Sequence, residues 1–332
     1  MLRFAMRSED EILVVGGAGY IGSHAVKELA RVGFHPVTYD NLSRGHRDAV
    51  TAGDFELGDL GDRARLDEVF RRHRLRAVMH FGAYINVGES VSEPAKYWHN
   101  NVAAPLALLD TMRAHEVDAF IFSSTCATYG EPVETPMTEA HPQKPVNPYG
   151  KTKLALEQAL ADYGSAYGLR SIVFRYFNAA GADPDGDIGE RHDPETHLIP
   201  LVFEAARTGE AVSVLGDDYP TPDGTCVRDY IHVTDLAKAH LAGLRKLLAG
   251  DRGGAYNLGN GNGYSVKEVL ACVERVTGRK VPRVVAPRRP GDPATLVGSA
   301  EKAKDELGWK PRFPSLEQIV QTAWSFHQRQ RR

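Results

Sequence analysis

Cysteine is scarce in this sequence, and its three copies lie far apart. Cys126, Cys226 and Cys272 are odd in number and share no short spacing, so the sequence predicts neither a disulfide framework nor a cysteine-based zinc site. On this basis we expect no metal. Long apolar runs are also missing, because no stretch reaches the roughly 18 apolar residues that a transmembrane helix needs. We therefore expect no membrane partner.

An excess of charge of either sign is missing too. The chain has 40 lysines and arginines against 43 aspartates and glutamates, which gives no electrostatic reason to expect nucleic acid or an anionic surface as a partner. The N-terminal run MLRFAMRSEDEILVVGG lacks the apolar core and the cleavage site of a signal peptide. We expect a soluble, cytoplasmic protein.

Short apolar runs alternate with helical patterns in the first half of the chain. Predicted strands are EILVVGG, HPVTYDN, RAVMHFGA, AFIFSST and SIVFRYFNAAG, and the helices between them include a long one over residues 93–117 and one that begins at Pro148. This alternation predicts an α/β fold, a doubly wound parallel sheet covered by helices on both faces. In such sheets, ligands bind at the carboxyl ends of the strands.

The alternation stops after Gly181. Residues 182–197 are polar and rich in turn-forming residues, and the remainder mixes short strands with helices. We expect residues 1–180 to form one domain around this sheet, to which segments within about 211–258 partly return. Residues 181–332 would form a smaller, interleaved α/β substrate lobe. A chain of 332 residues is long enough for two such cores.

The run VVGGAGYIGSH places Gly16, Gly19 and Gly22 between the first predicted strand and the following helix. Glycine lets the backbone turn tightly and approach a pyrophosphate, which then lies at the helix N-terminus. Asp40 ends the next predicted strand, and its carboxylate suits the hydroxyls of an adenosine ribose but repels a 2′-phosphate. The pattern predicts a Rossmann-type dinucleotide site that prefers NAD. Arg44 favours the opposite choice, because an arginine there suits the phosphate of NADP.

Asp59, in the run ELGDLGD, has two interpretations. Its carboxylate either meets the adenine amino group or caps the helix predicted at RARLDEVF. The two roles are compatible with each other.

Tyr149 and Lys153 lie four residues apart at the start of the helix predicted from Pro148. This spacing places both side chains on one helix face. The ordinary reason for such a pair is a lysine stem packed over a ring. The alternative is chemical: a cation beside a phenol favours the phenolate, which would lower the pKa of Tyr149 and let it transfer a proton. The pair alone does not decide between the two.

Seven runs along the chain carry a resemblance to a known family. They are GGAGYIGSH, VGESV, NPYGKTK, RYFNAAGADP, GTCVRDYIHV, YNLGNG and PRRPGD. With these runs the chain resembles the extended short-chain dehydrogenase/reductase family over nearly its full length, and within that family the UDP-glucose 4-epimerase branch, where the runs occur in this order. The glycine loop and the Tyr/Lys pair are shared by many relatives, whereas the last few runs are specific to nucleotide-sugar enzymes.

The resemblance implies an isomerase that inverts C4 of a UDP-hexose, UDP-galactose or UDP-glucose, with NAD and through a transient 4-keto sugar. Tyr149 would be the acid/base at the sugar 4-hydroxyl, Lys153 would bind the nicotinamide ribose and lower the pKa of Tyr149, and Thr125 would bridge the sugar oxygen to Tyr149. The implied cofactor-binding residues are Gly16, Gly19, Tyr20, Ile21, Gly22, Asp40, Asn41, Asp59, Leu60, Phe81, Gly82, Ala83, Asn100, Ser123, Tyr149, Lys153 and Tyr176.

The resemblance also implies a set of residues that bind the UDP-sugar. Arg228 and Arg289 make physical sense in this set, because a guanidinium fork matches a diphosphate, although each could instead form a surface salt bridge. The implied substrate-binding residues are Thr125, Tyr149, Asn178, His197, Leu198, Ser213, Val214, Leu215, Arg228, Tyr230, Arg289, Asp292 and Leu296.

A homodimer is implied as well, formed through the helices near residues 94–115 and after Pro148. Small and apolar side chains on these helices have two interpretations, because they would either line the dimer face or belong to the core. They are Ala103, Ala104, Leu108 and Leu154.

Three positions depart from the family pattern. Ile85 stands where members often have Lys near the cofactor ribose, and His197 replaces an Asn that touches the nucleotide sugar. Leu296 occupies a position where small residues accompany N-acetylated sugars and Tyr accompanies plain hexoses. We expect a preference for UDP-glucose and UDP-galactose, with weak action on UDP-GlcNAc.

Other activities stay open as alternatives. Thr125 is followed by Cys126 and Ala127, whereas related 4,6-dehydratases carry an Asp-Glu pair there to eliminate water, so dehydration is disfavoured. A 4-epimerase of UDP-GlcNAc and UDP-GalNAc, or of a UDP-pentose, needs the same three catalytic residues. A catalytically silent NAD-binding regulator would not need those three residues together.

Overall fold

The structure, a computed structural model, describes residues 10–289 and 291–330, which divide into two compact units. The first unit comprises the described residues up to 130 with residues 143–175 and 237–256. The second comprises residues 131–142, 176–236 and the described residues from 257 onward. The segment 131–142 thus groups with the second unit, although it precedes the expected boundary at residue 180. No helix in the described part of the chain has the length and apolar character to cross a membrane.

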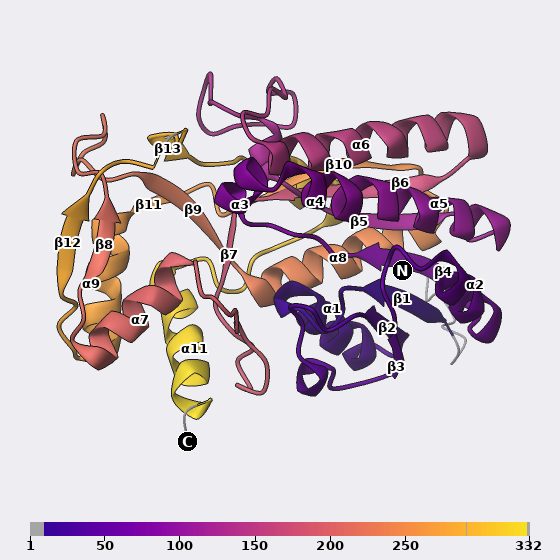
Figure 1. Cartoon of the computed structure of the whole chain (residues 1–332), viewed down its shortest axis with the longest axis horizontal. Helices are drawn as coiled ribbons and strands as arrows, with labels where there is room; N and C mark the ends of the chain where they lie inside the picture. The colour runs from indigo at the N-terminus through magenta and orange to yellow at the C-terminus, as the bar shows by residue number, and fades with distance from the viewer. Residues whose placement is uncertain (1–9, 290, 331–332) are drawn as a thin grey trace. The chain divides into compact units, whose positions relative to one another are not determined.

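The first unit is built on a seven-stranded sheet of order β10-β6-β5-β4-β1-β2-β3 (Figure 1). The pairs β1-β2, β1-β4, β2-β3 and β4-β5 are all parallel. The predicted Rossmann-type α/β fold is confirmed. The strands are β1 (Glu11–Val15), β2 (His35–Asp40), β3 (Asp54–Leu57), β4 (Leu75–His80), β5 (Ala119–Thr125), β6 (Arg170–Tyr176) and β10 (Gly253–Leu258).

Both faces of this sheet are buried. Leu13, Val15 and Val78 pack in one cluster with apolar residues of α2, α5 and α6. Successive side chains of a strand point to opposite faces, so Ile12 and Val14 face the other side, and they are buried too. The apolar runs of the strands are therefore continuous, as is typical of a parallel sheet with helices on both faces. The helices of this part are α1 (Tyr20–Arg31), α2 (Arg63–Arg72), α3 (Val87–Ser92), α4 (Pro94–Trp98), α5 (Ala104–Ala114), α6 (Pro148–Tyr167) and α8 (Val233–Leu248), with short 3₁₀ turns η1 (Arg47–Ala49) and η3 (Cys126–Thr128).

The long helix expected over residues 93–117 is present but is interrupted. A π-helical segment, η2 (His99–Ala103), lies between α4 and α5. Such segments are frequent at functional sites, and this one contains Asn100. The long strand expected at SIVFRYFNAAG is likewise divided into β6 and β7 (Asn178–Ala180).

The second unit is organised around β9 (Val227–His232). This strand pairs in parallel with β7 and with β13 (Thr295–Leu296), and antiparallel with β11 (Gly263–Ser265). A separate parallel pair joins β8 (Val212–Leu215) to β12 (Arg283–Ala286). The helices α7, α9 and α11 surround one apolar cluster of this unit. Its helices are α7 (Leu198–Thr208), α9 (Val266–Thr277), α10 (Glu301–Leu307) and α11 (Leu316–Arg329).

A buried ion pair joins α6 to β6 in the first unit. Arg175 Nη2 lies 2.6 Å from Glu157 Oε2, and both side chains are less than one-tenth exposed. Ser124 and Gln143 donate to the same carboxylate, and Arg175 also donates to the Tyr129 hydroxyl. Every polar group in this network therefore has a partner, which is the condition under which a buried charge is tolerated.

Replacing Arg175 by Met should lower the free energy of unfolding by about 3–5 kcal/mol, because the Glu157 carboxylate would stay buried without its cation. Urea unfolding followed by circular dichroism measures the change. Arg207→Met is the matched control, since Arg207 pairs with Glu204 at the surface and such pairs contribute at most about 1 kcal/mol. Equal losses in the two variants would contradict the role given to burial.

Candidate active site

The predicted glycine loop lies between β1 and α1. Gly16 has a positive φ of 76°, and a Cβ on it would lie 2.5 Å from the Gly82 nitrogen. A Cβ on Gly22 would lie 2.2 Å from the Gly16 carbonyl oxygen. No other residue type fits these two positions without a shift of the backbone. The loop can therefore lie close to the segment after β4 on one side and close to the first turn of α1 on the other.

The N-terminus of α1 carries no side-chain cap. Gly19 is the N-cap residue and has no side chain to accept from the first-turn N–H groups. Tyr20, Ile21 and Gly22 follow as the first residues of the helix. Uncapped N–H groups and the helix dipole together favour an anion at this point. The residues present thus fit the pyrophosphate of a dinucleotide.

Asp40 ends β2 beside this loop and is buried. Its carboxylate accepts from the backbone N–H groups of Ala18, at 3.0 Å, and Leu42, at 2.8 Å. Burial raises the pKa of Asp40, and these two hydrogen bonds oppose the shift. The carboxylate therefore holds the glycine loop in place, and its remaining acceptor capacity suits a ribose hydroxyl.

Asn41 and Asp59 lie together at the ends of neighbouring strands. The Asn41 amide donates to Asp59 Oδ2 at 2.7 Å, and Asp59 Oδ1 accepts from Gly61 N–H. The suggestion that Asp59 caps the next helix is wrong, because Asp62 is the N-cap of α2 and accepts from Arg65 N–H at 3.0 Å. Leu60, next to Asp59, is buried.

Phe81, Gly82 and Ala83 follow β4, and Phe81 N–H donates to the Val15 carbonyl at 2.8 Å. Asn100 donates to the amide oxygen of Asn101 at 2.9 Å. Asn101 is buried, and it joins Tyr84 to α6.

Asn101 accepts from Tyr84 N–H, donates to the Tyr84 carbonyl and donates to Thr152 Oγ1. Asn101 was not predicted from the sequence. A polar residue at a helical core position was the only signal that could have found it.

Tyr149 is placed by the way in which α6 begins. Asn147 caps the helix by accepting from Gly150 N–H at 2.8 Å, and Pro148 occupies the first helical position, as is typical of helix starts. A Cβ on Gly150 would lie 2.4 Å from the Ala127 carbonyl oxygen. The glycine therefore lets α6 approach the turn η3, which directly follows Thr125 at the end of β5.

The three predicted catalytic side chains come together in the first unit. The Tyr149 hydroxyl shares a hydrogen bond with the Thr125 hydroxyl, and Thr125 Oγ1 also accepts from Ala127 N–H at 3.1 Å. Lys153 Nζ lies 5.9 Å from the centre of the Tyr149 ring and donates to the Ser123 carbonyl at 2.8 Å. All three residues are buried.

The expected lowering of the Tyr149 pKa is wrong. Burial raises the pKa of Tyr149, and the hydrogen bond from Thr125 only opposes that shift. Burial also lowers the pKa of Lys153 to about 7, while the Glu157 carboxylate raises it. The reason is that both groups are removed from water, so each favours its neutral form. Burial therefore favours the protonated phenol.

In the second unit, β9 gathers five of the predicted substrate residues. Arg228 and Tyr230 lie two apart on β9 and share a face, and the register places Leu296 opposite Arg228 and Asn178 opposite Tyr230. Asp292 Oδ1 lies 2.6 Å from Arg228 Nη2. The ion-pair alternative for Arg228 is thus present, but the arginine is buried rather than at the surface.

The remaining predicted substrate residues lie on other elements of this unit. Ser213, Val214 and Leu215 belong to β8, opposite β12. Arg289 is exposed in a turn, in which Asp292 N–H donates to its carbonyl. Tyr176, predicted to meet the cofactor, ends β6 and is buried.

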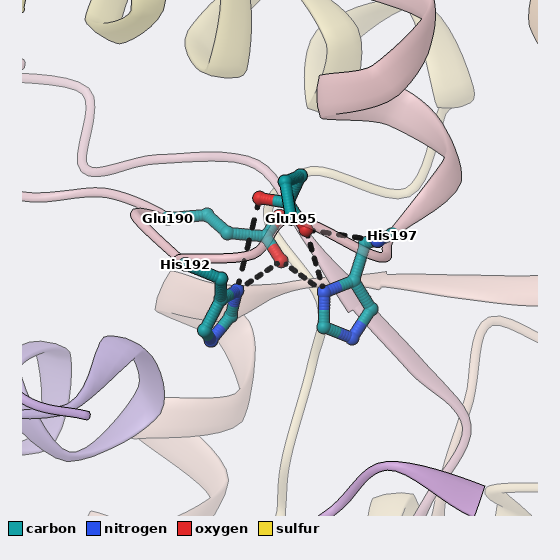
Figure 2. Close-up of side chains that lie close together, drawn as sticks. All are labelled: Glu190, His192, Glu195 and His197. Atoms are coloured by element: carbon teal, nitrogen blue, oxygen red, sulfur yellow. Dashed lines mark hydrogen bonds and ion pairs between the residues drawn. The ribbon is translucent and has the colours of Figure 1, made fainter. Parts of the chain in front are cut away.

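His197 is the N-cap residue of α7, and Leu198 is the first residue of that helix. The Nδ1 atom of His197 faces two carboxylates, that of Glu190 at 2.7 Å and that of Glu195 at 3.2 Å (Figure 2). Burial lowers the pKa of His197, but the hydrogen bonds of these carboxylates outweigh it and raise the pKa to about 10. Because Nδ1 is engaged by these carboxylates, only Nε2 of His197 could form a hydrogen bond to a nucleotide.

Comparison with known proteins assigns the chain to a family. Residues 12–259 match the NAD dependent epimerase/dehydratase family. The chain belongs to this family. A relative from Rhizobium meliloti (strain 1021), named UDP-glucose 4-epimerase, is 55% identical over 321 residues, which are 96% of this chain and 98% of that protein.

Two solved structures of members of the family are similar to the chain. UDP-glucose 4-epimerase from Brucella ovis in complex with NAD has a TM-score of 0.93 at 51% identity and covers 96% of this chain and 98% of its own. UDP-glucose 4-epimerase from Bifidobacterium longum in complex with NAD⁺ and UDP has a TM-score of 0.91 at 38% identity and covers 96% of this chain and 98% of its own. The predicted resemblance and the predicted NAD dependence are confirmed.

Lys153→Met tests the burial of the lysine in nucleotide-free protein. The pKa of Lys153, about 7, lies below its ordinary value of 10.5. Between these values the unfolded chain binds more protons than the folded one, so Lys153 makes the free energy of unfolding rise with pH, by up to about 1.4 kcal/mol per pH unit. The stability of wild type relative to Lys153→Met should therefore increase from about pH 7 to about pH 9 in urea unfolding.

Lys151→Met provides the control for that measurement, because Lys151 is exposed on the same helix. A rise of the same size relative to Lys151→Met, or a flat difference for Lys153→Met, would show that the burial of Lys153 does not govern its protonation.

Proposed function

We propose that this chain is a UDP-glucose 4-epimerase, which interconverts UDP-galactose and UDP-glucose with NAD. The observation that carries the proposal is the buried group of Thr125, Tyr149 and Lys153 beside β5, in a family member with the glycine loop intact. A hydroxyl relay and a buried amine at the carboxyl end of a parallel strand suit proton transfer at a sugar hydroxyl. The test is to incubate purified protein with UDP-galactose and to measure UDP-glucose by chromatography.

The mechanism assigns each residue a defined task. As the phenolate, Tyr149 takes the proton of the sugar 4-hydroxyl when a hydride leaves C4. It returns the proton to the oxygen when the hydride is given back to the opposite face of the rotated 4-keto sugar. The hydrogen bond from Thr125 lowers the pKa of Tyr149 and so helps the phenol to release its proton. Bound NAD⁺ supplies the hydride acceptor and a positive charge that favours the phenolate. Lys153, held by the Ser123 carbonyl, would bind the nicotinamide ribose.

The nucleotide part of the substrate is assigned to the second unit. Arg228 and Arg289 would bind the diphosphate, because a guanidinium fork matches it. Asp292 neutralises Arg228 in this structure, at 2.6 Å, so the bound diphosphate competes with or shares that pairing. Firm binding of UDP with loose binding of the sugar is what the reaction requires, since the 4-keto sugar must rotate between its two hydride transfers.

We further propose that the protein acts as a cytoplasmic homodimer. Leu108, one of the side chains offered for the dimer face, lies in the core of the first unit instead. Ala103 is exposed, and Ala104 and Leu154 are partly buried. Of the four side chains offered for the dimer face, three are therefore at least partly exposed and one is not.

Tyr149→Phe should lower the turnover of UDP-galactose by at least about a hundredfold, because only the proton-transferring oxygen is removed. Binding of NAD should stay close to that of wild type. The matched control is Tyr163→Phe on the same helix, where the hydroxyl donates to Asp110 at 2.9 Å. Wild-type turnover in Tyr149→Phe would remove Tyr149 from the acid/base role.

Turnover should favour the plain hexoses over their N-acetylated counterparts. Leu296 is partly buried on β13 beside Arg228, and its branched side chain limits the room for a large 2-substituent more than a small residue does. We expect UDP-galactose to be turned over faster than UDP-GalNAc, and Leu296→Ala to reduce that ratio. Equal rates for the two sugars in wild type would contradict the preference.

A further inference from the structure

A cluster of two histidines and two glutamates lies in the loop between β7 and α7, in the second unit. Glu190, His192, Glu195 and His197 follow the spacing E-x-H-x-x-E-x-H. Figure 2 shows both imidazoles turned toward both carboxylates. The donor atoms, one from each side chain, all lie within 4.8 Å of one another.

The contacts in this Glu–His cluster form a closed ring. Nδ1 of His192 lies 3.2 Å from Glu190 Oε1 and 3.8 Å from Glu195 Oε2. Nδ1 of His197 lies 2.7 Å from Glu190 Oε1 and 3.2 Å from Glu195 Oε1. Each imidazole thus presents the same nitrogen to the same two carboxylates, and the four side chains converge on one point.

These separations suit a single four-coordinate metal ion. Zinc binds imidazole nitrogens and carboxylate oxygens at about 2.0–2.2 Å, and tetrahedral geometry then places neighbouring donor atoms about 3.3–3.6 Å apart. Three of the four separations given above are shorter than this range and one is longer, so a modest opening of the ring would bring them close to it. All four donors come from eight consecutive residues, so no distant segment has to be recruited.

We propose that Glu190, His192, Glu195 and His197 bind one zinc ion. The donor set supports this choice. Imidazole favours zinc and its transition-metal neighbours over magnesium or calcium, and two carboxylates balance the charge of a divalent ion. With four protein ligands the site has no open position, which is typical of a structural rather than a catalytic zinc ion.

The proposed zinc would stabilise the start of α7. His197 is the N-cap residue of that helix, and Ile199, Val202 and Phe203 of α7 belong to the apolar cluster of the second unit. A metal on Nδ1 would also fix the ring of His197 with Nε2 as its only other polar atom. Binding of a ligand to the folded state alone raises the free energy of unfolding, so zinc should also raise the melting temperature.

The alternative is that protons alone join the four side chains. In that state both imidazoles are cationic, and each lies within ion-pair distance of both carboxylates. Such a cluster is also electrically balanced, so charge does not decide between the two states. A measurement of zinc binding distinguishes the two states, because only the proposed metal site is expected to bind one equivalent of zinc.

A second cluster in the first unit provides an internal control. Glu11, His35 and Asp54 also lie within reach of one another, but this group has only one imidazole and Asp54 is half exposed. His35 Nε2 lies 2.9 Å from Asp54 Oδ2, as in an ordinary surface ion pair. We propose no zinc site there.

The experiment is a calorimetric titration of zinc chloride into full-length, untagged protein that has been treated with a chelator and freed of it. Wild type and His35→Gln should each bind one equivalent. Glu195→Gln and His192→Gln, each checked for folding by circular dichroism, should bind at least about tenfold more weakly, because each removes one ligand. X-ray absorption at the zinc edge should show four nitrogen or oxygen ligands at about 2.0–2.2 Å in wild type.

Three outcomes would overturn the proposal. They are less than half an equivalent bound by wild type, binding by Glu195→Gln that equals that of wild type, and loss of binding in His35→Gln alone. Glu195→Gln keeps the size of the side chain, so it decides the question if His192→Gln fails to fold. None of these readouts depends on turnover of a UDP-sugar, so the zinc proposal and the proposed function fail or succeed separately.

Discussion

The close approach of α6 to the turn after β5 is the constraint on which the chemistry of the first unit depends. A hydrogen in place of a side chain at Gly150 allows it, because a Cβ would lie 2.4 Å from the Ala127 carbonyl oxygen. The approach places Tyr149 in hydrogen-bonding contact with Thr125 and gives Lys153 the Ser123 carbonyl as its acceptor. Both groups are then buried, and burial sets their protonation more strongly than their mutual charge does.

In the second unit, the corresponding constraint is the backbone of β9. Three other strands pair with this strand or its ends, and the pairing brings Asn178, Arg228 and Leu296 together from distant parts of the chain. Asp229, between Arg228 and Tyr230, faces the other way and accepts from the N–H groups of Asn260 and Gly261. Burial raises its pKa to about 6. One face of β9 thus holds Arg228 and Tyr230, which we propose to bind the UDP-sugar, and the other face anchors the loop that follows β10.

Much of the first unit could be predicted from the sequence, because its signals are local. The glycine loop, the capped start of α6 and the apolar strands each depend on neighbouring residues, and the family resemblance added the residue roles. The interruption at Asn100 and Asn101 was not predicted, since a single π-helical turn of five residues is too short to change the apolar period of the surrounding sequence noticeably. The pKa of Tyr149 was predicted in the wrong direction, because a spacing of four residues says nothing about loss of water.

The Glu–His cluster was overlooked for a different reason. The cysteine spacing predicts no zinc site, and the polar, turn-rich composition of residues 182–197 predicts only a loop. Histidine and glutamate are common in solvated loops, so their spacing alone has little weight. Only the folded loop shows that both Nδ1 atoms and both carboxylates face one point.

The interleaving of the two units has a consequence for the order of synthesis. β10 lies at one edge of the seven-stranded sheet, beside β6. In the sequence, β10 comes only after the run from Tyr176 to Leu236, which belongs to the second unit. During synthesis, one edge of β6 therefore stays unpaired until residue 258 has left the ribosome. An unpaired strand edge can pair with another chain. A nascent chain that pauses between these two strands is the form most exposed to aggregation.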